Sequence, residues 1–325
     1  MQRHLRRFLL ALLVGVAVYG AFVAYTGHRA IGGSLASFRW SAFAAALGLA
    51  TLNYVLRWLK WEYYLGRLEV RHVPKLDSAL VFLSGFVLTI TPGKVGEVFK
   101  SAVLAETHGV PVARTAPIVV AERLTDVIGV IALIVVGSVG FQGGLGWAAA
   151  GTACVVAGMT VIVWRAPGEW LIARLERRSG RAAALAPRLR EAFDSMRILA
   201  SPAALLYPTL LSVLGWGGEG LALALLLEGF GTPSPIPLAM FFYATATLAG
   251  AIVPVPGGLG VAEAMIQEQL VRLGGVPAAP ATAAMILIRF ATLWWAVIVG
   301  FAALGVLRVR FPHLLRGSPE APTPA

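Results

Sequence analysis

The stretch Pro254-Val255-Pro256-Gly257-Gly258-Leu259-Gly260-Val261-Ala262-Glu263 interrupts a strongly apolar part of the sequence. Proline lacks a backbone N–H and glycine costs backbone entropy in a helix, so this composition predicts a break between two helical segments. A break inside lipid leaves backbone groups unpaired, which is tolerated only where protein or a water-filled cavity surrounds them. The carboxyl group of Glu263 follows about one helical turn later. We therefore expect the chain to hold this element at membrane depth.

The composition indicates a polytopic membrane protein. The 325 residues are 58% hydrophobic and 13% charged, and the mean hydropathy is +0.78. Soluble domains carry about a quarter charged residues. The formal charge of +11 comes from Lys and Arg gathered in short segments between apolar runs, so no nucleic-acid partner is expected. The single cysteine, Cys154, lies in an apolar run and excludes an intrachain disulfide.

Six segments have the roughly 20 apolar residues that a membrane-spanning helix needs. The first follows a basic start and is interpreted as an uncleaved helix rather than a signal peptide. A short loop at 27–39 precedes the second, and the basic, aromatic loop after the second places Lys60 and Trp61 at the membrane interface. The predicted spans are 8–26, 41–60, 117–138, 147–164, 203–227 and 280–307.

Two further apolar segments are too short to cross a membrane comfortably. Segment 77–90 ends at Thr91-Pro92-Gly93-Lys94-Val95-Gly96-Glu97, and a second short segment runs to about Leu104. Segment 238–253 leads into the break quoted above, with a return limb to about Leu273. Pairs of half-length segments around a Pro/Gly break are typical of re-entrant hairpins. The predicted fold is all-α, with about six spans and two re-entrant hairpins.

The charge distribution favours this topology, with both termini in the cytoplasm. The basic segments 57–75, 165–201 and 308–316 then lie inside. The loops 140–146, 229–236 and 274–279, which contain no Lys or Arg, lie outside. His28, Arg29 and Arg39 oppose the rule. If one hairpin alone crossed the membrane, the later basic segments would lie outside, so the multi-pass inner-membrane topology with re-entrant hairpins is preferred.

The two breaks resemble each other and define the expected domain organisation. Arg123 follows Gly93 by 30 residues, and Arg289 follows Gly257 by 32 residues. Entry from opposite faces makes the repeats inverted, a plan that recurs in transporters with the substrate between the broken helices. The expected units are a transmembrane domain 1–308, made of repeat one (41–138), an amphipathic cytoplasmic linker (165–201) and repeat two (203–307), and a disordered tail 309–325.

Ionisable groups in apolar segments cost about 2.5–3.5 kcal/mol each, so they are expected to face the bundle interior and to be paired. Helix N-termini after each break favour an anionic group such as a phosphate, which arginine binds in bidentate fashion. The candidate substrate-binding residues are Asn53, Arg57, Lys94, Glu97, Lys100, Glu122, Arg123, Asp126, Glu219, Pro256, Gly257, Gly258, Gly260, Glu263 and Arg289.

Several of these residues also have a plainer interpretation. Arg57 can reach the interface from a helix end, and Glu122 with Asp126 can lie on a hydrated helix start. Glu268 and Arg272 can form a surface pair. The five histidines are scattered at loops and ends, so neither a metal site nor a cofactor is expected. No G-x-S-x-G, P-loop or dinucleotide motif is present, which disfavours an enzyme but leaves a membrane-embedded transferase open.

Several motifs together resemble the lysylphosphatidylglycerol synthase transmembrane family, also called flippase-like domain proteins. They are Asn53 with Arg57-Trp58, the 91–97 break with Lys100, Ala121-Glu122-Arg123 with Asp126, and the 254–260 break with Glu263. The resemblance covers about residues 8–308 and implies lipid translocation. Only 17 residues follow Arg308, so the soluble aminoacyl-transferase domain of two-domain relatives is not expected here.

The leading hypothesis is a flippase that moves a lipid across the inner membrane. The resemblance allows anionic, aminoacylated, polyprenyl-linked and hopanoid lipids. In this hypothesis Lys94, Arg123 and Arg289 attract the phosphate, while Glu97, Glu219 and Glu263 balance charge or bind a cationic headgroup. The expected partners are the lipid substrate and the bilayer, with a homodimer possible in principle. A lipid-modifying transferase and an accessory subunit of a cell-envelope complex are the alternatives.

Overall fold

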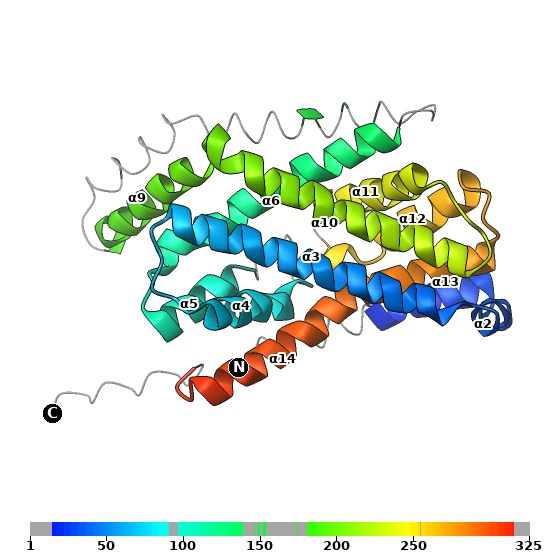
Figure 1. Ribbon diagram of the computed structural model, residues 1–325, viewed down its shortest axis with the longest axis horizontal. Coiled ribbons are helices and arrows are strands. Elements are labelled where there is room, and N and C mark those ends of the chain that lie inside the picture. Colours follow the sequence, from blue (N-terminus) through cyan, green and yellow to red (C-terminus); the bar gives the residue numbers. More distant parts are fainter. Residues whose placement is uncertain are drawn as a thin grey trace.

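The computed structural model describes residues 15–90, 97–138, 146, 149, 152–153, 174, 181–253 and 255–314. Within these ranges the chain contains helices and turns and no strand (Figure 1), so the predicted all-α class is confirmed. The predicted span 147–164, the first break with Lys94, the cysteine Cys154 and the tail from 315 onwards lie wholly or mostly outside the described residues.

The helices follow one another along the chain with few long connections. They are Gly15–Thr26, α2 (His28–Ala36), α3 (Trp40–Arg67), α4 (Lys75–Ser84) with a 3₁₀ turn (Gly85–Leu88), α5 (Phe99–His108), α6 (Val112–Gly137), α9 (Arg181–Leu199), α10 (Pro202–Gly229), α11 (Ile236–Ile252), a 3₁₀ turn (Pro256–Gly258), α12 (Val261–Arg272), and α13 (Ala278–Arg289), which continues through a π-helical turn (Phe290–Trp294) into α14 (Trp295–Arg310).

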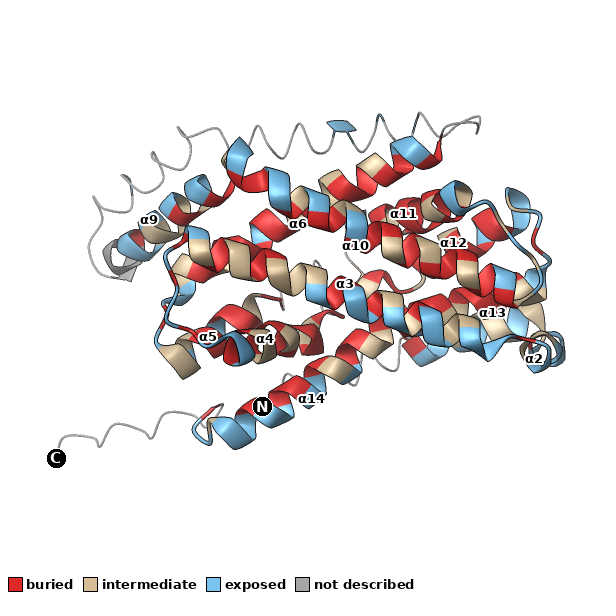
Figure 2. Cartoon of the chain, in the orientation of Figure 1, coloured by how far each residue is buried: buried red, intermediate tan, exposed pale blue. Residues whose placement is uncertain are grey.

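Three described helices are long and apolar enough to cross a membrane: Trp40–Arg67, Pro202–Gly229 and Ala278–Arg310. They correspond to the predicted spans 41–60, 203–227 and 280–307. The membrane class is therefore supported, while the count of six spans stays a prediction. The outer surface agrees with it, because Leu206, Leu210 and Leu214 form an exposed apolar stripe on α10, whereas buried residues gather inside the bundle (Figure 2).

The structure corrects two local predictions. The segment 27–39, predicted as a loop, contains the nine-residue helix α2. The second span does not end near residue 60, because α3 continues to Arg67. Lys60 and Trp61 are therefore not interfacial residues, and both side chains are fully buried among neighbouring helices.

The half-length helices predicted at the two breaks form pairs at opposite ends of the molecule (Figure 1). The 10 residues of α4 and of α5 and the 12 of α12 are each too short for a 30 Å hydrocarbon layer at about 1.5 Å per residue. The pairs meet inside the bundle. A β-carbon on Gly257 of the second break would lie 3.6 Å from Ile90 Cα, the last described residue before the first break.

Glycines allow close approach where α6, α10 and α11 pack together. A β-carbon on Gly137 of α6 would lie 2.6 Å from the carbonyl oxygen of Pro237, and one on Gly220 of α10 would lie 2.8 Å from Met240 Cα. Both distances are shorter than van der Waals contact, so these positions require glycine. Backbone contact of this kind is typical of helix packing in membranes, where the hydrophobic effect does not drive association.

The basic segments share one end of the bundle, as the charge pattern predicts. Arg67 at the end of α3 and Arg190 of α9 line one cavity, and Arg310 at the end of α14 lies 2.6 Å from Asp77 in the first turn of α4. At the opposite end, Arg39 before α3 is 3.0 Å from Glu228 at the end of α10. The α3 and α10 helices therefore run antiparallel. Arg39, which opposes the charge rule, sits in an ion pair there.

Candidate functional site

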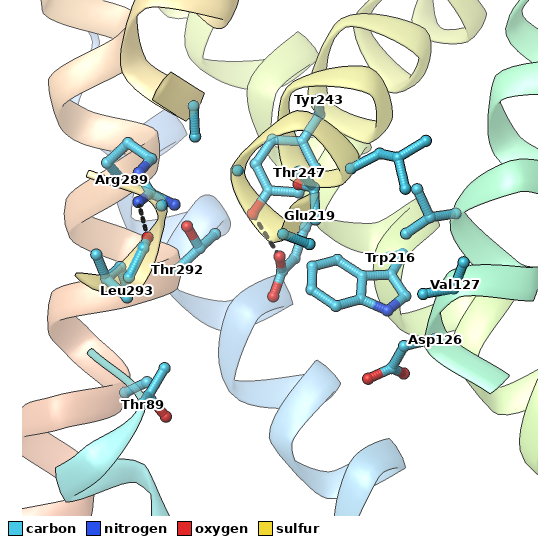
Figure 3. A pocket seen from close by; sticks show the side chains of 18 of the residues that line it. Thr89, Asp126, Val127, Trp216, Glu219, Tyr243, Thr247, Arg289, Thr292 and Leu293 are labelled. Carbon is cyan, nitrogen blue, oxygen red and sulfur yellow. Dashed lines mark hydrogen bonds between the residues drawn. The ribbon is translucent and has the colours of Figure 1, made fainter. Parts of the chain in front are cut away.

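A cavity of about 310 Å³ lies where the two broken elements meet, enclosed by α3, α6, α10, α11 and the α13–α14 helix (Figure 3). Apolar side chains contribute to its lining, among them Val130, Leu248 and Leu293. The polar part of the wall is formed by Tyr54, Arg57, Thr89, Arg123, Asp126, Trp216, Glu219, Tyr243, Thr247, Arg289 and Thr292. The cavity therefore presents charged and apolar surfaces side by side in the interior of an apolar bundle.

Glu263, in the first turn of α12, stabilises the backbone of the second break. Its Oε2 accepts a 2.7 Å hydrogen bond from the Gly260 N–H, and its Oε1 accepts one of 2.6 Å from Arg289 Nε. Tyr19 Oη donates to the same oxygen at 3.3 Å. The carboxylate thus satisfies a helix N-terminus and a guanidinium together, and it is fully buried.

The backbone of this break depends on glycine. Gly257, Gly258 and Gly260 have φ angles of 61°, 69° and 87°, in the left-handed region that L side chains rarely adopt. Arg289 NH2 donates a 2.7 Å hydrogen bond to the carbonyl oxygen of Gly257, so the guanidinium also pairs a group that the helix break leaves open. Figure 3 shows Arg289 on the cavity wall, facing the centre from α13.

The first half of the chain contributes a second cluster of charges. Glu97, at the start of the limb after the first break, lies 3.0 Å from Arg123 NH2 and 3.5 Å from Arg57 NH2. The Arg123 NH2 group is also 3.1 Å from Asp126 Oδ2. One guanidinium therefore bridges two carboxylates and joins the first broken element to α6.

Two buried lysines extend this cluster. Lys60 Nζ donates to Asp126 Oδ1 at 2.6 Å and to Ser212 Oγ at 2.8 Å, which connects α3, α6 and α10. Lys100 Nζ donates to Glu122 Oε2 at 2.5 Å and lies 4.6 Å from the centre of the Trp61 ring. Such pairs persist in an apolar interior because each charge keeps its partner.

Glu219 occupies the middle of the cavity and links three helices. Its Oε1 accepts a 2.6 Å hydrogen bond from Asn53 Nδ2 of α3, and its Oε2 accepts one of 2.5 Å from Tyr243 Oη of α11 (Figure 3). Gly215, one turn earlier in α10, makes room for Asn53, because a β-carbon there would overlap the Asn53 amide. The sequence Trp216-Gly217-Gly218-Glu219 thus brings a carboxylate to the cavity between closely packed helices.

Three buried donors on the cavity wall have no hydrogen-bond partner among the described residues: Tyr54 Oη, Thr89 Oγ1 and Arg123 Nε. A buried donor without a partner costs about 1–3 kcal/mol. These three groups are therefore available to a ligand that brings hydrogen-bond acceptors, and a phosphate or another oxygen-rich group meets that requirement.

The structure brings most of the predicted site residues together. Arg57, Arg123, Asp126, Glu219, Gly257, Gly258 and Arg289 line the cavity. Asn53, Glu97, Lys100, Glu122, Gly260 and Glu263 support these residues through the contacts described above or shape the break, and Pro256 begins the 3₁₀ turn within it. Lys94 lies outside the described residues.

Two of the plainer interpretations are wrong and one is confirmed. Arg57 does not reach for the interface, since it pairs with Glu97 and packs on the Phe86 ring at 5.2 Å. Glu122 and Asp126 are not on a hydrated helix start, because α6 begins at Val112 and both carboxylates are buried in ion pairs. The Glu268–Arg272 pair is an exposed surface pair, as predicted.

The polar residues of the site that sequence reasoning missed include Tyr54, Lys60, Thr89 and Tyr243. Helical spacing carries the signal for Lys60, because Asn53, Arg57 and Lys60 follow the i, i+4, i+7 pattern of one helix face. No sequence signal separates Tyr54, Thr89 and Tyr243 from the many other hydroxyl groups of the apolar helices. Among the described residues no group of three or more His, Cys, Asp or Glu side chains is placed to hold a metal ion.

Comparison with protein families decides the relationship of the chain. The family model described as the lysylphosphatidylglycerol synthase TM region matches residues 8–300. The chain belongs to this family. Membership in the lysylphosphatidylglycerol synthase TM family confirms the membrane class and indicates a function related to membrane lipids. A search of curated proteins finds no match for the chain.

Proposed function

We propose that this protein is a lipid flippase or transporter that moves a lipid headgroup across the inner membrane through the cavity between the two breaks. The observation that carries the proposal is the position of the cavity. It lies where two half-length helix pairs from opposite ends of the molecule meet, and both charged and apolar side chains line it. An amphipathic ligand matches such a wall.

The volume of the cavity supports transport of a headgroup rather than enclosure of a whole lipid. Small-molecule pockets measure about 300–1,000 Å³, and the 310 Å³ here is near the lower end of that range. In this proposal the headgroup passes through the cavity while the acyl or isoprenoid chains stay in the bilayer. The exposed apolar side chains of α10 then face lipid.

The donors of the cavity favour a phosphate-bearing headgroup. Arg123 has a free Nε–H on the cavity wall, and Tyr54 and Thr89 add two hydroxyl groups. Arginine offers several N–H groups in one plane, which suits a phosphate. Arg123 also pairs with Glu97 and Asp126, so an anionic headgroup competes with these two carboxylates for the Arg123 guanidinium. Since Glu97 belongs to the first broken element, this competition acts on a contact of that element.

The charges around the cavity balance, which argues for reversible rather than tight anion binding. Among the described residues, the charged side chains in or next to the cavity comprise five basic groups, Arg57, Lys60, Lys100, Arg123 and Arg289, and five acidic groups, Glu97, Glu122, Asp126, Glu219 and Glu263. A transporter must release what it binds, and a site without excess positive charge lets a phosphate leave.

The same pairing disfavours a transferase. A carboxylate that acts as a general base or a nucleophile must be free to reach the substrate. The carboxylates of Asp126, Glu122 and Glu263 are instead held by buried lysine or arginine side chains. We therefore propose that the protein is not an enzyme.

We also propose a topology for this transporter in which both termini lie in the cytoplasm. The end of the bundle that carries Arg67, Arg190 and Arg310 then lies on the cytoplasmic side as well.

The test is translocation by purified protein in vesicles that contain a tail-labelled anionic phospholipid. A membrane-impermeant quencher reports the label in the outer leaflet, so a second, protein-dependent phase of quenching measures movement between leaflets. The proposal predicts this phase for the wild type and for Arg272→Ala, whose side chain is exposed. It predicts a strongly reduced phase for Arg123→Ala. No protein-dependent phase with anionic, aminoacylated or isoprenoid-linked lipids would overturn the proposal, and product formed from a labelled group donor would favour a transferase.

A further inference from the structure

We propose that the cavity opens sideways into the bilayer beside Ala251 and Val253, and that the apolar chain of the lipid leaves the cavity through this opening. The proposal rests on the transport function proposed above and adds the route of the chain and the orientation of the lipid. A headgroup in transit stays joined to its chain, so a cavity that holds only the headgroup needs a way out for the chain. We call this opening the lateral portal.

The end of α11 is where the described wall of the cavity reaches the outer surface. Ala251 and Val253 line the cavity and are exposed, whereas the other described residues that line it are buried or half-buried. Ile252 lies between them, is 62% exposed and is not among the lining residues, so the exposed surface here belongs to the outside of the bundle. The lining of the cavity therefore continues onto the outer surface at this point.

α6 forms the wall next to the portal. Its end contacts the start of α11, because a β-carbon on Gly137 would lie 2.6 Å from the carbonyl oxygen of Pro237 and 2.7 Å from Phe241 Cβ. Val127 precedes Gly137 by ten residues and Ala251 follows Phe241 by ten, which is about 15 Å along each helix. Both Val127 and Ala251 line the cavity, so the helices run in opposite directions and these two residues lie at a similar depth.

The portal lies within the hydrocarbon layer in the proposed topology. α11 starts near the outer face, and its 17 residues cover about 25 Å along the helix axis, against a layer about 30 Å thick. Irregular backbone faces lipid only if its polar groups are paired. The Val253 N–H donates to the Ala249 carbonyl oxygen and the Val255 N–H to that of Val253, while Pro254 has no N–H to pair. The N–H donors of this segment therefore allow contact with an apolar chain.

The rim of the portal is apolar on its outer side and closely packed on its inner side. A β-carbon on Gly250 would lie 3.3 Å from Ala262 Cβ and 3.4 Å from Gly258 Cα, so the end of α11 packs directly on the second break. The exposed side of the same turn carries Ala251 and Val253. A hydrocarbon chain matches these side chains, and the methyl group of Ala251 leaves more space beside it than a larger side chain would.

The arginine next to the portal orients the lipid. Arg123 precedes Val127 by one helical turn on α6, and its side chain is 24% exposed, compared with 13% for Arg57 and 11% for Arg289. Among the described residues, Arg123 Nε has no hydrogen-bond partner. The phosphate that is joined to the apolar part of the lipid binds at Arg123, and the rest of the headgroup extends toward the buried Tyr243. The lipids that fit carry their phosphate directly next to the apolar part.

The first experiment detects the chain in the portal without requiring transport. The full chain without Cys154 carries a fluorescent label on Val253→Cys or, as the control, on Leu210→Cys at the exposed surface of α10. The vesicles contain an anionic phospholipid or a diacylglycerol, which lacks the phosphate, each with a quenching nitroxide near the carboxyl end of one acyl chain. At position 253, half-maximal quenching should require about tenfold less phospholipid than diacylglycerol, because only the phospholipid is held at Arg123. At position 210 the two lipids should quench alike. Equal values at position 253 would overturn the portal.

The second experiment closes the portal. Ala251→Trp fills the rim and should lose most of the protein-dependent translocation of an anionic phospholipid. Ile252→Trp is the matched control, because the adjacent residue is exposed and is not among the lining residues, and it should keep the wild-type rate. Both substitutions lie at exposed positions, so both proteins should keep the wild-type unfolding midpoint. Val253→Trp repeats the test at the second exposed lining residue. Wild-type rates in both lining variants would overturn the portal.

The two experiments separate the portal from the transport function. Selective quenching at position 253 without lipid movement in the wild type would preserve the chain site and refute transport. Lipid movement that Ala251→Trp and Val253→Trp leave unchanged, with equal quenching by the two lipids at position 253, would preserve transport and refute the portal.

Discussion

Arg289 Nε donates a 2.6 Å hydrogen bond to Glu263 Oε1 and so joins α13 to the first turn of α12 across the second break. The guanidinium also binds the Gly257 carbonyl, and the carboxylate binds the Gly260 N–H. We therefore expect a substitution of Glu263 or Arg289 to change the conformation of the break directly and ligand binding only as a consequence.

Glu263→Gln should therefore destabilise the protein strongly. The amide cannot neutralise Arg289, and breaking a buried ion pair by removing one partner costs about 3–5 kcal/mol. Thermal unfolding in detergent should show a clear drop in midpoint. The matched control is Glu268→Gln in the same helix, whose exposed pair with Arg272 is worth about 0–1 kcal/mol. Equal midpoints for the two variants would contradict the role of Glu263 in the break.

Gly215→Ala should disturb the site, although the substitution adds only one carbon. The new β-carbon overlaps the Asn53 amide and displaces it from Glu219, with an overpacking cost of about 1–3 kcal/mol. Gly218→Ala in the same helix is the control, since a β-carbon there meets nothing within 4 Å and alanine favours a helix. We expect Gly215→Ala to lose stability and translocation and Gly218→Ala to keep both. A reversed order would refute the close approach of α3 and α10.

Tyr54→Phe and Thr89→Val should separate function from stability. Neither hydroxyl has a hydrogen-bond partner among the described residues, so removing it should leave the unfolding midpoint nearly unchanged. If the hydroxyls bind a charged headgroup, each loss of about 1.5–3 kcal/mol lowers apparent affinity about tenfold or more. Titration of translocation rate against lipid content measures this. Tyr243→Phe, which removes a hydrogen bond to Glu219, should by contrast lower stability. Unchanged translocation in the first two variants would remove them from the site.

Single cysteines in a background without Cys154 should report the sidedness of the bundle. Glu191 of α9 and Glu69 after α3 line the cavity at the basic end, and Thr232 lies in the loop after α10 at the other end. An impermeant thiol reagent added to sealed right-side-out membranes should label a cysteine at 232 and spare those at 69 and 191. Labelling of 69 or 191 from outside would contradict the proposed orientation.

The sequence predicted the fold class, the two half-length pairs and most of the charged residues of the site. These signals are local: Pro and Gly stop a helix, and an ionisable side chain in an apolar run must face inward. The roles within the site were harder to predict. Glu263 and Glu219 look alike along the chain, yet one is held by an arginine and a backbone N–H and the other by an amide and a hydroxyl. Lys60 was misplaced because the end of α3 depends on tertiary packing.

The measurement that tests the central claim most directly is the rate at which purified protein moves a tail-labelled anionic phospholipid between leaflets, compared for wild type, Arg123→Ala and Arg272→Ala. The cavity account predicts protein-dependent movement in the wild type and in Arg272→Ala, and a loss of about tenfold or more in Arg123→Ala, whose guanidinium provides a free donor on the cavity wall. Equal rates in all three proteins, or rates no faster than in protein-free vesicles, would contradict it.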